Sequence, residues 1–210
     1  MTQFLAKGWC CLFFLALTLN ACTGVSVKDP DFVNKKVYED RASQLNATGV
    51  WGLVGKISLD DGDDGGSGRL QWSVEPGHSE LDFHGAMGRG AWHLQIGQDG
   101  VLLKMADGTE QTADDVNDLI QDRMGWPIPL DALQWWVRGL VAPGVIEKET
   151  YGPEGLLADL RQFGWDVDFK RYASFDGVEL PIRLNATNNN YRVKLAISRW
   201  RMDVRHDSTD

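Results

Sequence analysis

Apolar and polar residues alternate with a period of two over much of the chain between residues 50 and 201, which is typical of β-strands with one buried face. In residues 50–59 the alternation places Trp51, Leu53 and Ile57 on one face and Lys56 on the other. The same alternation recurs in residues 69–74, 81–84, 92–96, 144–149, 165–171, 180–186 and 191–201. Turn-forming stretches rich in Gly, Pro and Asp separate many of these segments, so the sequence predicts an antiparallel meander with one apolar face.

Two kinds of segment break this period. Residues 32–46 carry apolar groups at helical spacing and predict an amphipathic helix before the sheet. Residues 113–124 predict a second helix, ended by Gly125, and a third begins near Leu130. Residues 155–163 are ambiguous by themselves, because their leucines also favour a helix. About ten strands with a single apolar face must curl to bury it, and the mid-chain helices can cover the opening.

The N-terminus predicts a secreted, lipid-modified protein. Residues 9–19 are a short apolar run after Lys7, which fits the hydrophobic region of a signal peptide better than a membrane-spanning helix. The sequence Leu19-Asn20-Ala21-Cys22 resembles the lipobox of bacterial lipoproteins, which implies cleavage before Cys22 and acylation of that cysteine. Thr23 follows where inner-membrane retention signals typically carry Asp, so we expect the outer membrane, with the anchored protein facing the periplasm.

Charge and residue spacing argue against several functions. The 210-residue chain carries 21 Lys and Arg against 30 Asp and Glu, a net charge of −9, which argues against a nucleic-acid partner. All three cysteines lie at or before residue 22, so the sequence beyond it offers no disulfide or thiolate metal site. The four histidines show no metal-ligand spacing, and residues 60–72 match neither a calcium loop nor a nucleophile elbow. We therefore predict that the protein is not an enzyme and holds neither metal nor cofactor.

Residues 49–200 resemble the LolB family of outer-membrane lipoprotein receptors, which shares its fold with the periplasmic carrier LolA. An ordered set of motifs carries the resemblance: residues 51–57, 67–72, 86–88, 129–143, 161–165 with Tyr172, 180–181 and 194–200. The resemblance implies a mainly β fold, an unclosed antiparallel β-barrel of about ten or eleven strands with a helical lid over an apolar cavity. It also places a strand hairpin around Gly164 and Trp165, against the helical propensity of residues 155–163.

The resemblance further implies a function and a division of the chain. Residues 1–21 would be a lipoprotein signal peptide, 22–31 a lipidated tether and 32–205 a single half-barrel domain. The protein would accept acylated lipoproteins from LolA and insert them into outer-membrane phospholipid, and we expect it to act as a monomer. Family members carry an apolar residue on a protruding loop that is implicated in this insertion. Here the corresponding loop carries Met87.

Acyl chains impose a physical requirement that the apolar face could meet. Three chains of about 14 methylenes each, at about 0.8 kcal/mol per methylene, would cost about 30 kcal/mol if exposed to water. A continuous apolar cavity is therefore needed at every step of transfer. The residues that we expect to line it are Trp51, Leu53, Ile57, Leu70, Trp72, Phe83, Trp92, Leu94, Leu133, Trp136, Leu195 and Ile197.

Two alternatives to this function remain open from the sequence. The protein could be a lipocalin-like lipoprotein that binds a small apolar ligand without transferring it. It could also be a structural lipoprotein whose aromatic residues face a partner, and a filled core without a cavity would favour that role.

The basic residues of the terminal strand and tail also have two interpretations: Arg192, Lys194, Arg199, Arg201 and Arg205. They could protect an exposed edge strand against pairing with other chains, which is the interpretation the sequence favours. Alternatively, they could attract the carrier or anionic lipid.

Overall fold

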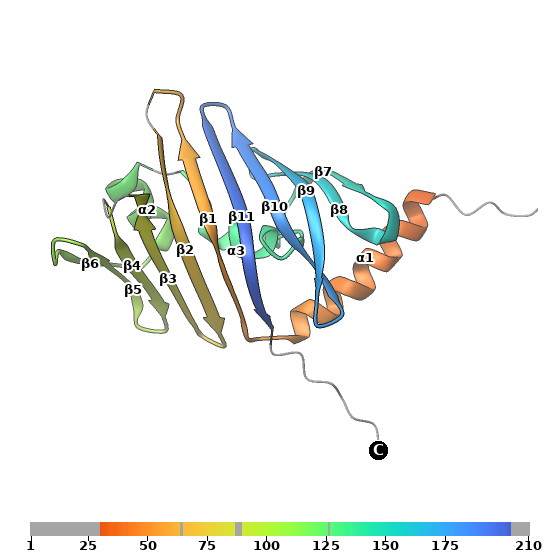
Figure 1. The fold of residues 1–210 in the computed structure, drawn as a ribbon, viewed down its shortest axis with the longest axis horizontal. Coiled ribbons are helices and arrows are strands. Elements are labelled where there is room, and N and C mark those ends of the chain that lie inside the picture. The colour runs from red at the N-terminus through yellow and green to blue at the C-terminus, as the bar shows by residue number, and fades with distance from the viewer. Residues whose placement is uncertain (1–29, 64, 87–89, 126, 203–210) are drawn as a thin grey trace, which may run out of the picture.

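Eleven antiparallel strands form one continuous sheet in the computed structural model, which describes residues 30–63, 65–86, 90–125 and 127–202 (Figure 1). The strands are β1 (Trp51–Asp60), β2 (Gly65–Glu75), β3 (His78–Gly85), β4 (Trp92–Gly97), β5 (Gly100–Met105), β6 (Glu110–Ala113), β7 (Ile146–Tyr151), β8 (Leu157–Gln162), β9 (Trp165–Phe175), β10 (Val178–Asn188) and β11 (Tyr191–Met202). The helices are α1 (Pro30–Ala47), α2 (Val116–Met124) and α3 (Leu130–Trp136). The predicted mainly β fold with helices before and within the sheet is confirmed.

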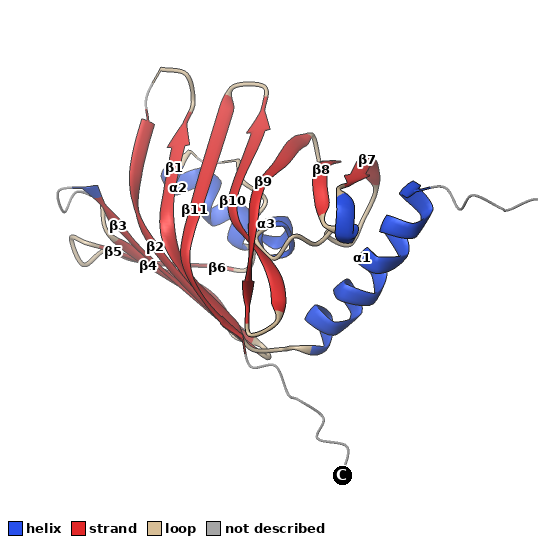
Figure 2. Cartoon of the chain, turned by 45° about the vertical axis from the view of Figure 1, so that its right-hand side comes forward, coloured by secondary structure: helices blue, strands red, loops and turns tan. Residues whose placement is uncertain are grey.

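The strand order is β6-β5-β4-β3-β2-β1-β11-β10-β9-β8-β7, so the first and last strands of the chain meet at the centre of the sheet. The pairing of β1 with β11 runs from Trp51 opposite Met202 to Asp60 opposite Arg192. The two ends of the order, β6 and β7, are hydrogen-bonded to one neighbour each in the described chain, so the barrel is unclosed as predicted. The sheet bends around α2 and α3, and α1 lies beside β7 and β8 (Figure 2).

This order corrects one interpretation of the terminal strand. β11 is hydrogen-bonded to β1 on one side and to β10 on the other, so it is a central strand. Its basic residues therefore do not protect an open edge, because that strand has none. The interpretation was wrong because the pairing of β1 with β11 joins segments about 140 residues apart, and alternation along a strand does not reveal its neighbours.

The chain between residues 97 and 113 forms two strands that the pattern did not predict individually. Val101 and Leu103 of β5 are buried, but Leu102 between them is also apolar, so polar and apolar residues do not alternate there. Residues 157–162 form β8, as the family resemblance implied and against helical propensity. The β8–β9 turn uses Phe163 and Gly164 at positive φ values of 53° and 72°.

The alternating apolar residues all point to one side of the sheet and form its core. Trp51, Leu53, Trp72 and Leu195 are each 2% exposed, while Lys56 on the other face is exposed. Burying a large apolar side chain contributes about 1.5–3 kcal/mol, so this continuous inner face is the main source of stability. The core therefore lies between the inner face of the sheet and the helices.

Local signals fix the ends of α2. Asp115 is its N-cap and accepts hydrogen bonds from the backbone nitrogens of Asn117 and Asp118. The helix thus begins three residues later than predicted, because Glu110–Ala113 pair with β5 instead. Gly125 ends it at φ 65°, the left-handed conformation that glycine adopts most readily.

Helix α1 packs against the short 3-10 helix Pro153–Gly155 at the β7 side of the sheet. A Cβ at Gly155 would lie 2.6 Å from the backbone oxygen of Asn34, so the close approach requires a glycine. Tyr38 and Leu45 of α1 are buried. Within the described residues, no helix has both the length and the hydropathy needed to cross a bilayer.

Candidate functional site: an apolar cavity beneath a helical lid

A small cavity lies between the inner face of the sheet and the two mid-chain helices. Its volume is about 30 Å³, close to the space that one water molecule occupies in the liquid. The sheet contributes Ile57, Leu70, Leu81 and Trp92, and the helical segment contributes Ile120, Ile128, Leu130 and Leu133. All eight side chains are apolar. The helices therefore rest on the sheet around this cavity.

Of the twelve residues that we predicted to line the cavity, four line it and eight lie in the core around it. Ile57, Leu70, Trp92 and Leu133 line it. The other eight lie in the surrounding buried core: Trp51, Leu53, Trp72, Phe83, Leu94, Trp136, Leu195 and Ile197. In the part of the chain that the structure describes, these eight side chains pack in the core, which is an arrangement that a purely structural lipoprotein would also show.

Three lining residues come from the helical segment and were not predicted. Ile120 had a sequence signal, because it follows the buried Val116 of the same helix by four residues. Leu130 was recognised as the start of α3 but not as a cavity residue. Ile128 lies between Pro127 and Pro129, outside any helix or strand, so no periodicity could assign it to the core.

The side chain of Asn117 in α2 forms hydrogen bonds with the first residues of α3. Its Oδ1 accepts a hydrogen bond of 2.8 Å from the backbone nitrogen of Leu130. Its Nδ2 donates to Asp131 Oδ2 at 3.0 Å. We call residues 115–125 and 127–136 the lid, because these bonds join its two helices.

The C-terminal end of the lid is held against the sheet by hydrogen bonds. Trp136 Nε1 donates to Gln162 Oε1 of β8 at 3.1 Å. The same Gln162 pairs with the backbone of Ala142, which donates through N at 3.1 Å and accepts through O at 2.7 Å. Val141 N donates to Tyr38 Oη at 2.8 Å, which adds a tie to α1. This end of the lid is therefore held by directional bonds, whereas the contacts around the cavity are apolar.

Two arginines beside this fastened end bond to backbone carbonyls. Arg41 of α1 donates to the oxygens of Arg138, Gly139 and Glu179 at distances of 2.6–3.1 Å. Arg138 is 5% exposed, lies over the rings of Trp51 and Trp135, and donates to the Gln134 oxygen at 3.0 Å. Burial lowers the pKa of both groups, that of Arg138 to about 10. Pattern reasoning missed both, because buried arginines interrupt the apolar periodicity.

The two remaining predicted site residues, Cys22 and Met87, lie outside the described residues. The hairpin that carries Met87 is described on both sides: Phe83 of β3 and Trp92 of β4 are paired, and their rings stack with centroids 5.4 Å apart. Among the described residues, no group of three or more His, Cys, Asp or Glu is arranged to hold a metal ion.

Comparison with known proteins identifies relatives of the whole domain. A family model described as outer membrane lipoprotein LolB matches residues 50–200. The outer-membrane lipoprotein LolB of Pseudomonas aeruginosa strain LESB58 is 32% identical over 187 residues, covering 87% of this chain and 90% of that protein. The LolB of Stutzerimonas stutzeri strain A1501 is also 32% identical, over 190 residues, covering 89% and 91%.

A solved structure shares the fold at low sequence identity. It is the crystal structure of a domain described as an outer membrane lipoprotein-sorting protein from Vibrio parahaemolyticus. The TM-score is 0.50 at 11% identity, and the alignment covers 83% of this chain and 94% of that domain.

Proposed function

Because the chain belongs to the LolB family of outer-membrane lipoproteins, we propose that it receives acylated lipoproteins from a LolA-type carrier and passes them to the outer membrane. Residues 1–21 would direct secretion, acylated Cys22 would anchor the protein, and residues 22–31 would connect the anchor to the domain. Family membership supports a role in lipoprotein localisation at this membrane. The acceptance of cargo from the carrier is the step that we propose.

The observation that carries this proposal is the all-apolar contact between the lid and the sheet. This cavity of about 30 Å³ is far too small for an acyl chain, so we propose that the lid moves away from the sheet to admit one here. The lid is suited to such movement, because Asn117 holds its helices together and Gln162 fixes its far end. We propose that the lid pivots at this fixed end and that acyl chains take its place against Ile57, Leu70 and Trp92.

No chemical bond needs to change in this process. Cargo can pass from carrier to receptor and on to the bilayer if each site binds the acyl chains more tightly than the last. A difference of 1.4 kcal/mol gives a tenfold preference, so modest differences in fit are sufficient. Anchoring through Cys22 would keep the receptor beside its target and raise the effective concentration of the final step.

Transfer from a loaded carrier tests the proposal directly. Purified full-length protein is incubated with a carrier–lipoprotein complex, and the cargo is followed by affinity capture of each protein. We expect the cargo to move to this protein. Ile120→Asn, which places an amide in the lid's apolar contact, should reduce acceptance several-fold. Gln121→Asn introduces the same residue at an exposed position of the same helix and should have no effect.

The same protein separates transfer from simple ligand binding. A fluorescent fatty acid is titrated against the wild type and against Ile120→Asn. Binding of the fatty acid without acceptance of lipoprotein would favour the lipocalin-like alternative. If neither ligand binds, the apolar core is structural and the proposal is wrong.

A further inference from the structure

The outer face of the sheet carries a row of four Lys or Arg side chains, one His and one Ala across six adjacent strands. The register places one residue of each strand in this row, from β9 to β3: Arg171, Arg183, Ala196, Lys56, Arg69 and His84. All six are exposed. In Figure 1 the helices α2 and α3 lie behind the strands, so this outer face is turned toward the viewer.

The central strand β11 adds a basic column that crosses this row. Arg192, Lys194, Arg199 and Arg201 are exposed on the outer face, while Val193, Leu195, Ile197 and Trp200 point into the core. We define the basic face as Lys56, Arg69, Arg171, Arg183, Arg192, Lys194, Arg199 and Arg201. It holds eight of the 21 Lys and Arg of a chain whose net charge is −9. These eight cations therefore lie together on the strands at the centre of the sheet.

Folding alone does not explain this arrangement. Lys56 lies directly opposite Arg69, and Arg183 directly opposite Arg171. Like charges at directly opposed positions destabilise a sheet, whereas opposite charges there would stabilise it by about 0.2–1 kcal/mol. In the described part of the chain, none of the eight basic residues forms an ion pair within 4 Å. Acidic residues lie on the same face: Asp60 opposite Arg192 at the end of β1, Glu80 and Asp82 on β3, and Asp166 and Asp168 on β9.

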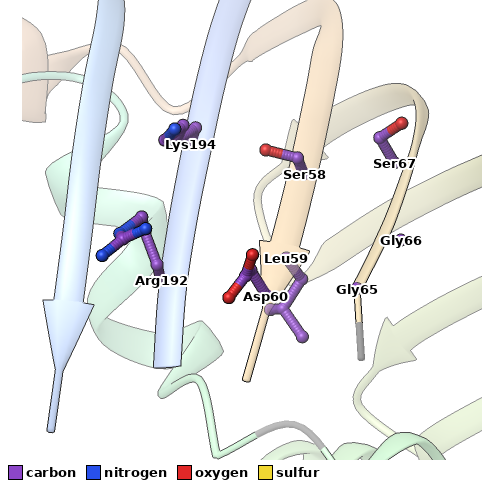
Figure 3. Close-up of a pocket in the computed structure, with 8 residues that line it drawn as sticks. All are labelled: Ser58, Leu59, Asp60, Gly65, Gly66, Ser67, Arg192 and Lys194. Atoms are coloured by element: carbon purple, nitrogen blue, oxygen red, sulfur yellow. The ribbon is translucent and has the colours of Figure 1, made fainter. Parts of the chain in front are cut away.

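Two hollows lie along β11 on this face, each with a volume of about 260 Å³. The first is lined by Arg192 and Lys194 with the hydroxyls of Ser58 and Ser67, and Asp60 stands at its edge (Figure 3). Glycines at positions 65 and 66 leave it open. The second is lined by Arg199, Arg201, Gln71 and Ser73, above Gly52. Both contain two cations and further hydrogen-bond donors, the groups that bind a phosphate.

We propose that the basic face docks on anionic phospholipid headgroups of the membrane to which the protein is anchored, with phosphates in the two hollows. The proposal rests on the proposed function, because the anchor supplies the nearby membrane. A cation near an anionic bilayer contributes about a fivefold preference for the docked state, and the effect fades beyond a Debye length. The chain as a whole is acidic, so the basic face is the part of the protein that such a surface attracts.

Docking in this way would orient the receptor. The lid lies on the opposite side of the sheet from the basic face, so it would face the aqueous phase, from which a loaded carrier arrives (Figure 2). The membrane would then hold the protein by two attachments, the acyl chains at Cys22 and the basic face.

Fluorescence quenching in vesicles tests the orientation. The full-length lipidated protein is reconstituted in vesicles of phosphatidylcholine, with or without 30% phosphatidylglycerol, that contain a lipid with a nitroxide on its headgroup. A fluorophore is attached at Ala196→Cys, which is exposed on the outer face and lines neither hollow, or at Gln121→Cys on the lid. Labelling is selective, because the chain has no cysteine beyond Cys22.

We expect strong quenching at position 196 and weak quenching at position 121, only with phosphatidylglycerol and only at low salt. Lys56→Gln with Arg183→Gln should reduce the ratio of docked to free protein about twenty-five-fold, fivefold for each cation. Lys104→Gln with Lys148→Gln, which removes two exposed cations elsewhere, should change it little. Equal quenching at both positions, or quenching insensitive to salt and to the Lys56 and Arg183 pair, would overturn the proposal.

Acceptance of cargo in detergent solution is measured on the same variants. Normal acceptance with lost quenching would support docking on lipid. If the Lys56 and Arg183 substitutions slow acceptance in detergent but leave quenching unchanged, the basic face binds an acidic protein partner and docking on lipid is wrong. If acceptance fails in the wild type while quenching is oriented as expected, the proposed transfer function fails and the docking remains.

Discussion

Trp136 Nε1 donates a hydrogen bond of 3.1 Å to Gln162 Oε1, and neither side chain has measurable exposed surface. Gln162 thus bonds to the last residue of α3. It also forms two hydrogen bonds with the backbone of Ala142, which lies between α3 and β7. Buried polar groups need such partners, because leaving one unpaired costs about 1–3 kcal/mol. Gln162 therefore fixes the end of the lid about which we propose that it pivots.

Replacing Gln162 with Met should leave the indole nitrogen of Trp136 and both backbone groups of Ala142 unpaired in a buried site. We expect the free energy of unfolding to fall by about 3 kcal/mol, since each buried unpaired group costs about 1–3 kcal/mol. Urea unfolding measures it, and the slope with denaturant should not change. Gln121→Met at an exposed position of α2 should change it by less than about 0.5 kcal/mol. Equal stability of the two variants would show that the Gln162 bonds contribute nothing.

The protein should lose stability steeply above pH 10. Burial raises the pKa of Tyr38, Tyr151 and Tyr172 above the ordinary value of 10.0, so the folded state keeps protons that the unfolded chain releases. The free energy of unfolding then falls with rising pH by about 1.4 kcal/mol per pH unit for each tyrosine. Burial lowers the pKa of Arg138 to about 10, so above that pH the unfolded chain holds more protons at this side chain than the folded protein. Its contribution to the free energy of unfolding therefore rises with pH and offsets part of the fall caused by the tyrosines. Urea unfolding between pH 9 and 11 should show the fall.

Tyr172→Phe provides the control for this pH dependence, because it removes one of the three buried hydroxyls. Its stability should decline about 1.4 kcal/mol per pH unit less steeply than that of the wild type above pH 10. At pH 7 the variant should also be less stable, since Tyr172 Oη donates a hydrogen bond of 2.7 Å to the Leu157 oxygen. Identical slopes for the two proteins would contradict the assignment.

Met87→Glu should impair delivery to the bilayer while leaving folding and acceptance nearly normal. A carboxylate is costly to place among headgroups and acyl chains, so cargo should accumulate on the receptor. Transfer from carrier to receptor and from receptor to vesicles is measured separately. Gln98→Glu adds the same charge at the exposed turn between β4 and β5, at the other end of β4, and should not impair delivery. Loss of acceptance, or a fall of several degrees in Tm, would show that Met87 is structural.

A secreted form that begins after Cys22 should still accept lipoproteins from the carrier if the acyl anchor only tethers the protein. We expect delivery to vesicles to slow, because the effective concentration beside the membrane is lost. The full-length lipidated protein is the control in both assays. Failure of the soluble form to accept cargo would mean that the anchor is part of the binding site.

The sequence by itself determined which residues face the core. A period of two places successive side chains on opposite faces of a strand, so Trp51, Leu53 and Leu195 could be assigned to the buried face one strand at a time. It also determined the helical segments and the end of α2 at Gly125, since capping is local. The family resemblance, rather than local pattern, gave the unclosed barrel and the assignment of residues 157–162 to a strand.

Only the tertiary structure decided which strands are neighbours and which side chains meet. The pairing of β1 with β11 made the terminal strand central and aligned Lys56 with Arg69, a relationship that no single strand contains. The contact between Trp136 and Gln162 likewise joins a helix to a strand 26 residues later. Alternation reports the face of a residue but carries no information about its partner across the sheet, because pairing energy depends on packing between segments that are distant in the chain.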